Sequence, residues 1–321
     1  MSRLLAINSE VLLTNNQLTL LTSKIGQRNS FFLAALPKDI AIQLNTFINN
    51  QDIDDNFKKH TLETLAKIKQ ENAIYNIKFD EKKTFNLTAK NFYAKDKRLA
   101  LAVTNKNDKP LKNIDDPSLF EGFEGPEVYT NKDDNYNLDK DAFWNYIEFH
   151  ARTSAKLALV GRYNKFFDTP DDGGWDYLKD PKPTDLFTLL DYIFKQLSTG
   201  NCRCEEFSIY CCPPEVEREM IIKQESLIKD FFKKLTKKYT PKYGIHYRIC
   251  DQDIKNELHE RKFLTNYAAF IMGDDLTNNR TKKTIQVITD EKVTKDNVDY
   301  WLSDYPVSGY DEKKVSYTIS G

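Results

Sequence analysis

The sequence predicts an α/β protein made of a mixed α/β N-terminal region and a C-terminal α/β domain. Apolar runs with the spacing of strands alternate along the chain with longer segments that have the spacing of helices. The chain has 321 residues, 40% of them hydrophobic, which is enough for a substantial core. Residues 116–140 are rich in Asn, Asp, Lys, Pro and Gly and are therefore expected to be a linker or a long loop.

The N-terminal region, residues 1–115, is expected to contain both strands and helices. Short apolar runs predict the strands, and apolar side chains three or four residues apart predict the helices. The strands are expected within residues 3–22, 31–36, 74–87 and 99–103, and the helices within residues 39–48 and 57–71. The sequence assigns this region no role.

The C-terminal domain, residues 141–321, has a more regular pattern. Strands are expected at residues 156–160, 207–212, 245–249 and 284–288, and helices at residues 184–197 and 215–239, with a loop at 166–183. Thr184 is expected to cap the first helix, with Asp185 complementing the helix dipole in the first turn.

One segment of this domain carries a regular set of polar side chains. His259 and Arg261 stand two apart in a strand-like run, Asn266 follows after four residues, and Gly273 follows after six more. Residues two apart on a strand share a face, so the imidazole and the guanidinium would lie side by side. A nucleophile next to a cation is the combination that a phosphodiester substrate needs.

This spacing resembles the signature of the phospholipase D-like phosphodiesterases, His-x-Lys-x4-Asp-x6-Gly-Ser. The spacing agrees throughout, but Arg261 replaces Lys, Asn266 replaces Asp, and Asp274 replaces Ser. The resemblance covers roughly residues 155–290 and implies a phospholipase D-like α/β sandwich for the C-terminal domain.

The resemblance implies a role for each matched residue. His259 would attack phosphorus and form a phosphohistidine, and Arg261 would hold the phosphate oxygens, although its shape differs from that of Lys. Asn266 would keep a hydrogen bond to the imidazole but lose the charge, and Gly273 would belong to the substrate-binding turn. The family chemistry uses neither metal nor cofactor. Because the chain has one such motif, a two-histidine site would need a homodimer that pairs two copies of His259.

Two functions follow from the resemblance, and the sequence leaves open whether the protein is an enzyme. The first is a nuclease-type phosphodiesterase that acts on or binds nucleic acid, because single-motif bacterial relatives are often nucleases and such modules also occur in cassettes that defend against phage. The alternative is a catalytically inactive domain that serves as a binding or assembly subunit, with a protein, nucleic acid or an acidic membrane as partner. A third reading takes the chain as an interaction subunit unrelated to the family.

Charge and cysteine content bound these readings further. The net charge is −1, so a nucleic-acid partner would need a local basic patch, for which Lys237 and Lys238 near the end of the second helix are the candidates. Cations at a helix C-terminus also complement its dipole, which is the alternative explanation. Cys202, Cys204 and the pair at 211–212 have poor spacing for zinc and are expected to be buried thiols.

The N-terminus has no signal-peptide pattern, and no apolar run is long enough to span a membrane. The number of cysteines is odd, and four of the five lie within residues 202–212, which is not the pattern of a secreted disulfide framework. The sequence therefore predicts a cytoplasmic protein.

Overall fold

The structure is a computed structural model of the chain and describes residues 3–8, 17, 21–26, 31–50, 52, 54–77, 80, 82–96, 99–116, 118–119, 128–130, 140–161, 166–167, 184–199, 202–211, 223–249, 261–272, 284–288, 302 and 316–319. The chain divides into two compact units, Met1–Pro126 and Glu127–Gly321. No helix among the described residues is long and apolar enough to cross a membrane.

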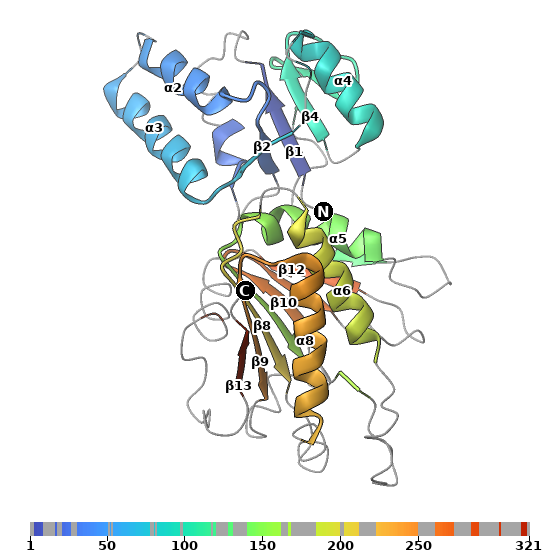
Figure 1. Cartoon of the computed structure of the whole chain (residues 1–321). Coiled ribbons are helices and arrows are strands. Elements are labelled where there is room, and N and C mark those ends of the chain that lie inside the picture. Colours follow the sequence, from blue (N-terminus) through green and yellow to red (C-terminus); the bar gives the residue numbers. More distant parts are fainter. Residues whose placement is uncertain are drawn as a thin grey trace. The chain divides into compact units, whose positions relative to one another are not determined.

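The first unit contains a parallel sheet of five strands in the order β3-β2-β1-β4-β5 (Figure 1). The strands are β1 (Arg3–Ile7), β2 (Phe31–Ala34), β3 (Ile74–Tyr75), β4 (Leu99–Thr104) and β5 (Leu111–Asn113). The helices are α2 (Ile40–Asn50), α3 (Asp55–Gln70) and α4 (Phe85–Lys95). The central strands are buried along nearly their whole length, as in a parallel sheet covered on both faces.

Two expectations for this unit are wrong. Phe85 and Leu87 were expected in a strand but lie in α4, because the hydroxyl of Thr84 accepts a hydrogen bond from the backbone N–H of Leu87 and caps a helix there. Residues 21–23 are helical, although the apolar run 3–22 predicted strands up to Thr22. A short apolar run fits either element when no cap is recognised.

The second unit contains a mixed sheet of eight strands in the order β13-β9-β8-β7-β10-β11-β12-β6. The strands are β6 (Val128–Thr130), β7 (Lys156–Gly161), β8 (Glu206–Cys211), β9 (Gly244–Ile249), β10 (Arg261–Thr265), β11 (Ala269–Met272), β12 (Thr284–Ile288) and β13 (Ser316–Ile319). Strands β7, β8 and β9 are parallel, and every other pairing is antiparallel. Within the stretch expected to be a linker, β6 pairs with β12.

Three helices, α5 (Lys140–Thr153), α6 (Asp185–Ser198) and α8 (Glu225–Tyr239), contribute to one hydrophobic core with alternate residues of the strands. Figure 1 shows α6 and α8 lying over the same face of the sheet. Leu157 and Leu159 of β7 belong to this core, so the alternate residues Lys156, Ala158 and Val160 lie on the opposite face of the sheet.

The α/β class is confirmed, and the predicted strands at 156–160, 207–212, 245–249 and 284–288 are present within one residue at each end. One detail is wrong. Thr184 precedes α6 but makes no side-chain cap bond, because its hydroxyl donates to the carbonyl of Phe166 at 3.2 Å. Of the predicted helix 215–239, residues 215–222 lie outside the described part of the chain.

Candidate functional site

The described part of the motif forms a tight hairpin of β10 and β11. Arg261 pairs with Met272, and Leu264 pairs with Ala269. Thr265 closes the turn, since its hydroxyl accepts from the backbone N–H of Ala268 at 3.0 Å. The register therefore brings Arg261 directly opposite the last strand residue before position 273. His259 and Gly273 themselves lie outside the described residues, as does the side chain of Arg261.

The open end of this hairpin lies at the side of the sheet where the parallel strands end, which we call the carboxyl edge. Strand β10 runs antiparallel to β7, with Lys262 opposite Val160 and Thr265 opposite Leu157. Arg261 thus lies beside the carboxyl end of β7. Because β8 and β9 run parallel to β7, their carboxyl ends lie at the same side of the sheet. Ligands of α/β sheets usually bind at the carboxyl ends of parallel strands.

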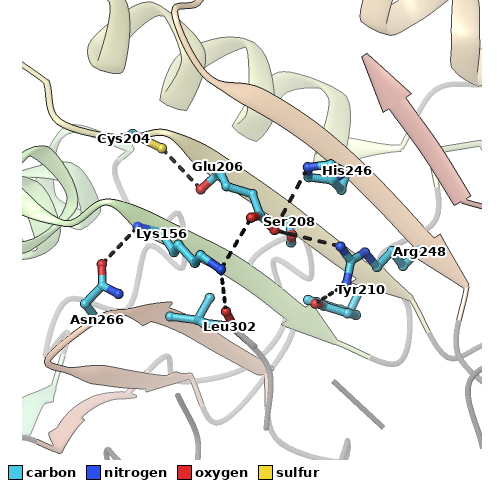
Figure 2. Close-up of polar contacts among 9 residues, drawn as sticks. All are labelled: Lys156, Cys204, Glu206, Ser208, Tyr210, His246, Arg248, Asn266 and Leu302. Atoms are coloured by element: carbon cyan, nitrogen blue, oxygen red, sulfur yellow. Dashed lines mark hydrogen bonds and ion pairs between the residues drawn. The ribbon is translucent and has the colours of Figure 1, made fainter. Parts of the chain in front are cut away.

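Asn266 lies at the other end of the hairpin. Its Oδ1 accepts a hydrogen bond from the backbone N–H of Lys156, the first residue of β7, at 2.9 Å (Figure 2). Four residues of extended chain lie between it and Arg261, and the five steps along the strand span roughly 16 Å. The structure therefore places Asn266 as a residue that fastens the hairpin to β7, away from the edge where Arg261 lies.

Lys237 and Lys238 also lie away from Arg261. They belong to the last turn of α8, after which the chain enters β9 at Gly244, the amino end of that strand. Lys238 forms an ion pair with Asp191, at 2.9 Å from its Oδ1, and this hydrogen bond raises the pKa of the lysine. The two lysines and Arg261 therefore lie at opposite edges of the sheet.

A cluster of polar side chains covers the face of β7, β8 and β9 that points away from α6 and α8 (Figure 2). We call it the Glu206 cluster. Its members are Lys156, Glu206, Ser208, Tyr210, His246 and Arg248. The register explains how they meet, because β8 pairs in parallel with β7 on one side and with β9 on the other.

Glu206 is the centre of this cluster. Its Oε1 accepts a hydrogen bond from the hydroxyl of Ser208 at 3.0 Å. The same oxygen lies 3.8 Å from Nη2 of Arg248 and 4.0 Å from Nε2 of His246, and Oε2 lies 3.7 Å from Nζ of Lys156. One carboxylate thus faces three basic groups, at distances longer than hydrogen bonds.

The described members of the cluster include two permanent cations and one carboxylate. Burial lowers the pKa of His246, and the charges of Arg248 and Lys156 lower it further, against the opposing effect of Glu206. Among the described residues, Nε of Arg248 is buried and has no hydrogen-bond partner, while Nη1 donates to the hydroxyl of Tyr210 at 3.2 Å. Nζ of Lys156 donates to the carbonyl of Leu302 at 3.2 Å, so of the two cations Arg248 is the one with an N–H group left unsatisfied among the described residues.

The sequence reasoning missed this cluster, although a signal was present. Glu206, Ser208 and Tyr210 alternate with apolar residues, and His246 and Arg248 stand two apart, in the same His-x-Arg spacing as the motif. Polar residues at every second position of a buried strand indicate a second, polar face.

The cysteines follow the expectation of buried thiols where they are described. Cys204 and Cys211 are buried, Cys202 is half-buried, and all three are thiols. Burial raises the pKa of the Cys204 thiol well above its usual range, so the thiol is protonated and unreactive at neutral pH. Within the described residues no group of three His, Cys, Asp or Glu side chains could hold a metal ion.

Comparisons with known proteins add little. Neither a scan against protein-family models nor a search of curated proteins gave a match. Among solved structures, the chain is similar to TrmBL2, an archaeal chromatin protein whose structure is described as showing a novel mode of DNA binding. The identity is 11%, the TM-score is 0.23, and the match covers 91% of this chain and 93% of that one. A TM-score this low carries no argument about fold or function.

Proposed function

We propose that residues 127–321 form a phospholipase D-like module that binds phosphodiester groups of nucleic acid and cleaves them without a metal ion. The observation that carries this proposal is the register of the hairpin. Arg261 lies opposite Met272, so the first and last residues of the described hairpin lie side by side. In the sequence, His259 comes two positions before Arg261 and Gly273 directly follows Met272.

The position of this end of the hairpin supports the proposal. It lies at the carboxyl edge of β7, β8 and β9, where α/β sheets usually bind ligands. In the proposed reaction His259 attacks phosphorus while the P–O bond to the leaving sugar oxygen breaks, and the second His259 of a homodimer protonates that oxygen. Water then hydrolyses the phosphohistidine, which frees His259. Arg261 holds two phosphate oxygens with its planar guanidinium. We assign Asn266 no chemical step in this proposal, because its Oδ1 accepts a hydrogen bond from the backbone of β7. It acts as a positioning residue for the hairpin.

The alternative is a module that binds nucleic acid or a protein partner without cleaving. The identity of Asn266 favours it, since a neutral amide whose Oδ1 already accepts one hydrogen bond steadies an imidazolium less than a carboxylate does. Asp274 also places a carboxylate where the family has a small hydroxyl. Both proposals use the same edge of the sheet and differ only in the chemical step.

The test is a cleavage assay on the full chain in the presence of EDTA, with labelled single-stranded DNA, double-stranded DNA and RNA. The variants are His259→Ala, Arg261→Glu, and His60→Ala as a control in an exposed histidine of the first unit. Cleavage that disappears in His259→Ala and persists in His60→Ala supports the phosphodiesterase.

The other outcomes separate the two proposals. If neither the wild type nor any variant cleaves, the wild type retards the labelled strand in a gel, and Arg261→Glu abolishes this retardation, the module binds without cleaving. If neither cleavage nor retardation occurs with any of the three nucleic acids, both proposals are rejected and a protein partner becomes the subject of the search.

A further inference from the structure

We infer that the Glu206 cluster is a binding site for a single phosphate group, held chiefly by Arg248 and Lys156. This site is separate from the proposed motif site, because it lies on the face of β7, β8 and β9 opposite the helices and is formed by other residues. The ligand class follows from the chemistry of the donors.

The first argument is the unsatisfied bonding capacity of Arg248. A guanidinium has five N–H groups, and here one hydrogen bond is made, from Nη1 to the hydroxyl of Tyr210 at 3.2 Å. Nε is buried with no partner among the described residues, and Nη2 lies 3.8 Å from Glu206, too far for a hydrogen bond. An arginine left in this state is suited to receive an oxyanion.

The second argument is charge. Among the described residues of the cluster, Lys156 and Arg248 bring two positive charges to one carboxylate, that of Glu206, and Nζ of Lys156 also donates to the carbonyl of Leu302 at 3.2 Å. These described groups carry a positive excess even with His246 neutral. Burial is the main cause of the lowered pKa of His246, and both cations oppose its protonation. A ligand with two negative charges would relieve this excess, and it would also favour protonation of His246.

The third argument is access. The side chains of Arg248, His246 and Lys156 are 12%, 18% and 30% exposed. Each side chain is therefore largely buried but keeps some solvent exposure, whereas Nε of Arg248 itself is buried. The aromatic ring of Tyr210 lies beneath the guanidinium of Arg248, 5.6 Å from its carbon, and limits the positions that the arginine can take. The donors are therefore held in place before a ligand arrives.

The experiment measures binding of inorganic phosphate to the full chain by calorimetry, at constant ionic strength set with chloride. Arg248→Gln is expected to weaken binding by roughly tenfold or more, since it removes a charge-assisted donor. Arg203→Gln is the matched control, because Arg203 is exposed and lies in the loop before β8. This variant is expected to bind phosphate as the wild type does. Arg261→Gln reports separately on the motif: if this variant loses phosphate binding while Arg248→Gln keeps it, the phosphate is held at the motif and the inference is overturned.

A variant with the opposite sign makes the test specific. Glu206→Gln removes the carboxylate that competes with phosphate for the cations, so phosphate is expected to bind more tightly than to the wild type. A purely structural ion network predicts no such gain. The inference is overturned if the wild type binds no phosphate, if Arg248→Gln binds within about threefold of the wild type, or if Glu206→Gln binds more weakly.

Two additions keep the test decisive. Circular dichroism checks that each variant folds, and Lys156→Gln replaces Arg248→Gln if that variant does not fold, with the same expected loss. Oligonucleotides with and without a 5′-phosphate then identify the source of the group. If only the 5′-phosphorylated strand competes with inorganic phosphate for binding, the site takes the phosphate at a nucleic-acid end. If neither strand competes, the site takes free phosphate or a small phosphorylated molecule.

Discussion

Asn266 accepts a hydrogen bond from the backbone N–H of Lys156 at 2.9 Å, across 110 positions of sequence. The bond joins the hairpin turn after β10 to the first residue of β7. A buried or half-buried N–H that loses its acceptor costs about 1–3 kcal/mol. This relationship gives the motif asparagine a structural role and leads to the first prediction.

Asn266→Leu is expected to lower the free energy of unfolding by about 1–3 kcal/mol, because the N–H of Lys156 then loses its acceptor. Asn266→Asp keeps an acceptor oxygen and should cost less. Urea denaturation followed by tryptophan fluorescence measures both. If Asn266→Asp instead raises cleavage activity with no change in stability, Asn266 acts on the chemistry and the positioning role is wrong.

A second prediction concerns the buried pair of Glu148 and Arg152 on α5. Nε of Arg152 lies 2.8 Å from Oε1 of Glu148, and the two side chains are 8% and 10% exposed. Glu148→Leu removes the carboxylate that faces a buried guanidinium, which keeps its hydrogen bonds to Thr199, and is expected to cost about 3–5 kcal/mol.

The double variant Glu148→Leu/Arg152→Met is the control for that effect. Because it removes both charges, it should be less destabilised than the sum of the two single variants. Additive losses in thermal or urea unfolding would show that the two side chains do not stabilise each other, contrary to the geometry.

The third prediction tests whether nucleic acid binds at the carboxyl edge of the second sheet or at the end of α8. If nucleic acid binds at the carboxyl edge, Arg261→Gln should reduce the slope of log K against log salt by about one phosphate contact. Lys237→Gln and Lys238→Gln should leave the slope unchanged, since both lysines lie at the opposite edge and Lys238 is already paired with Asp191. A loss of slope in the lysine variants equal to that of Arg261→Gln would instead place the interface at the end of α8.

Some elements of the second unit could be predicted from the sequence alone. Local patterns predicted β7, β8, β9 and α6 well, because each has a regular apolar period that neighbouring residues alone determine. The strand expected around Phe85 was a helix, because one threonine cap outweighed the apolar pattern.

The candidate site was harder to predict than the elements. The meeting of Glu206 with Arg248 depends on the register between β8 and β9, and the partner of Asn266 lies 110 positions away. A single sequence carries no direct signal for such pairings. The alternation of polar residues in β8 could have indicated a polar face, but it could not have said which cations would face the carboxylate.

The last prediction concerns pH and His150. Its ring is buried in α5, and it packs edge-on against Phe270 with 5.3 Å between ring centres. Burial lowers the pKa of His150 to about 3, from 6.5. Between these values the unfolded chain binds a proton that the folded chain does not, so stability is complete above the unfolded pKa and falls as the pH drops towards the folded one. From pH 7 to pH 5 this loss is about 2 kcal/mol.

His150→Phe keeps the ring contact and removes the titrating group, so it should remove about 2 kcal/mol of the stability loss between pH 7 and pH 5. Tryptophan fluorescence reports on the second unit, because all three tryptophans of the chain lie in it. His60→Gln, at an exposed histidine of the first unit, serves as the control and should keep the wild-type pH dependence. An unchanged pH dependence in His150→Phe would mean that His150 takes up its proton in the folded protein, and that the helix and the sheet open around this ring in mild acid.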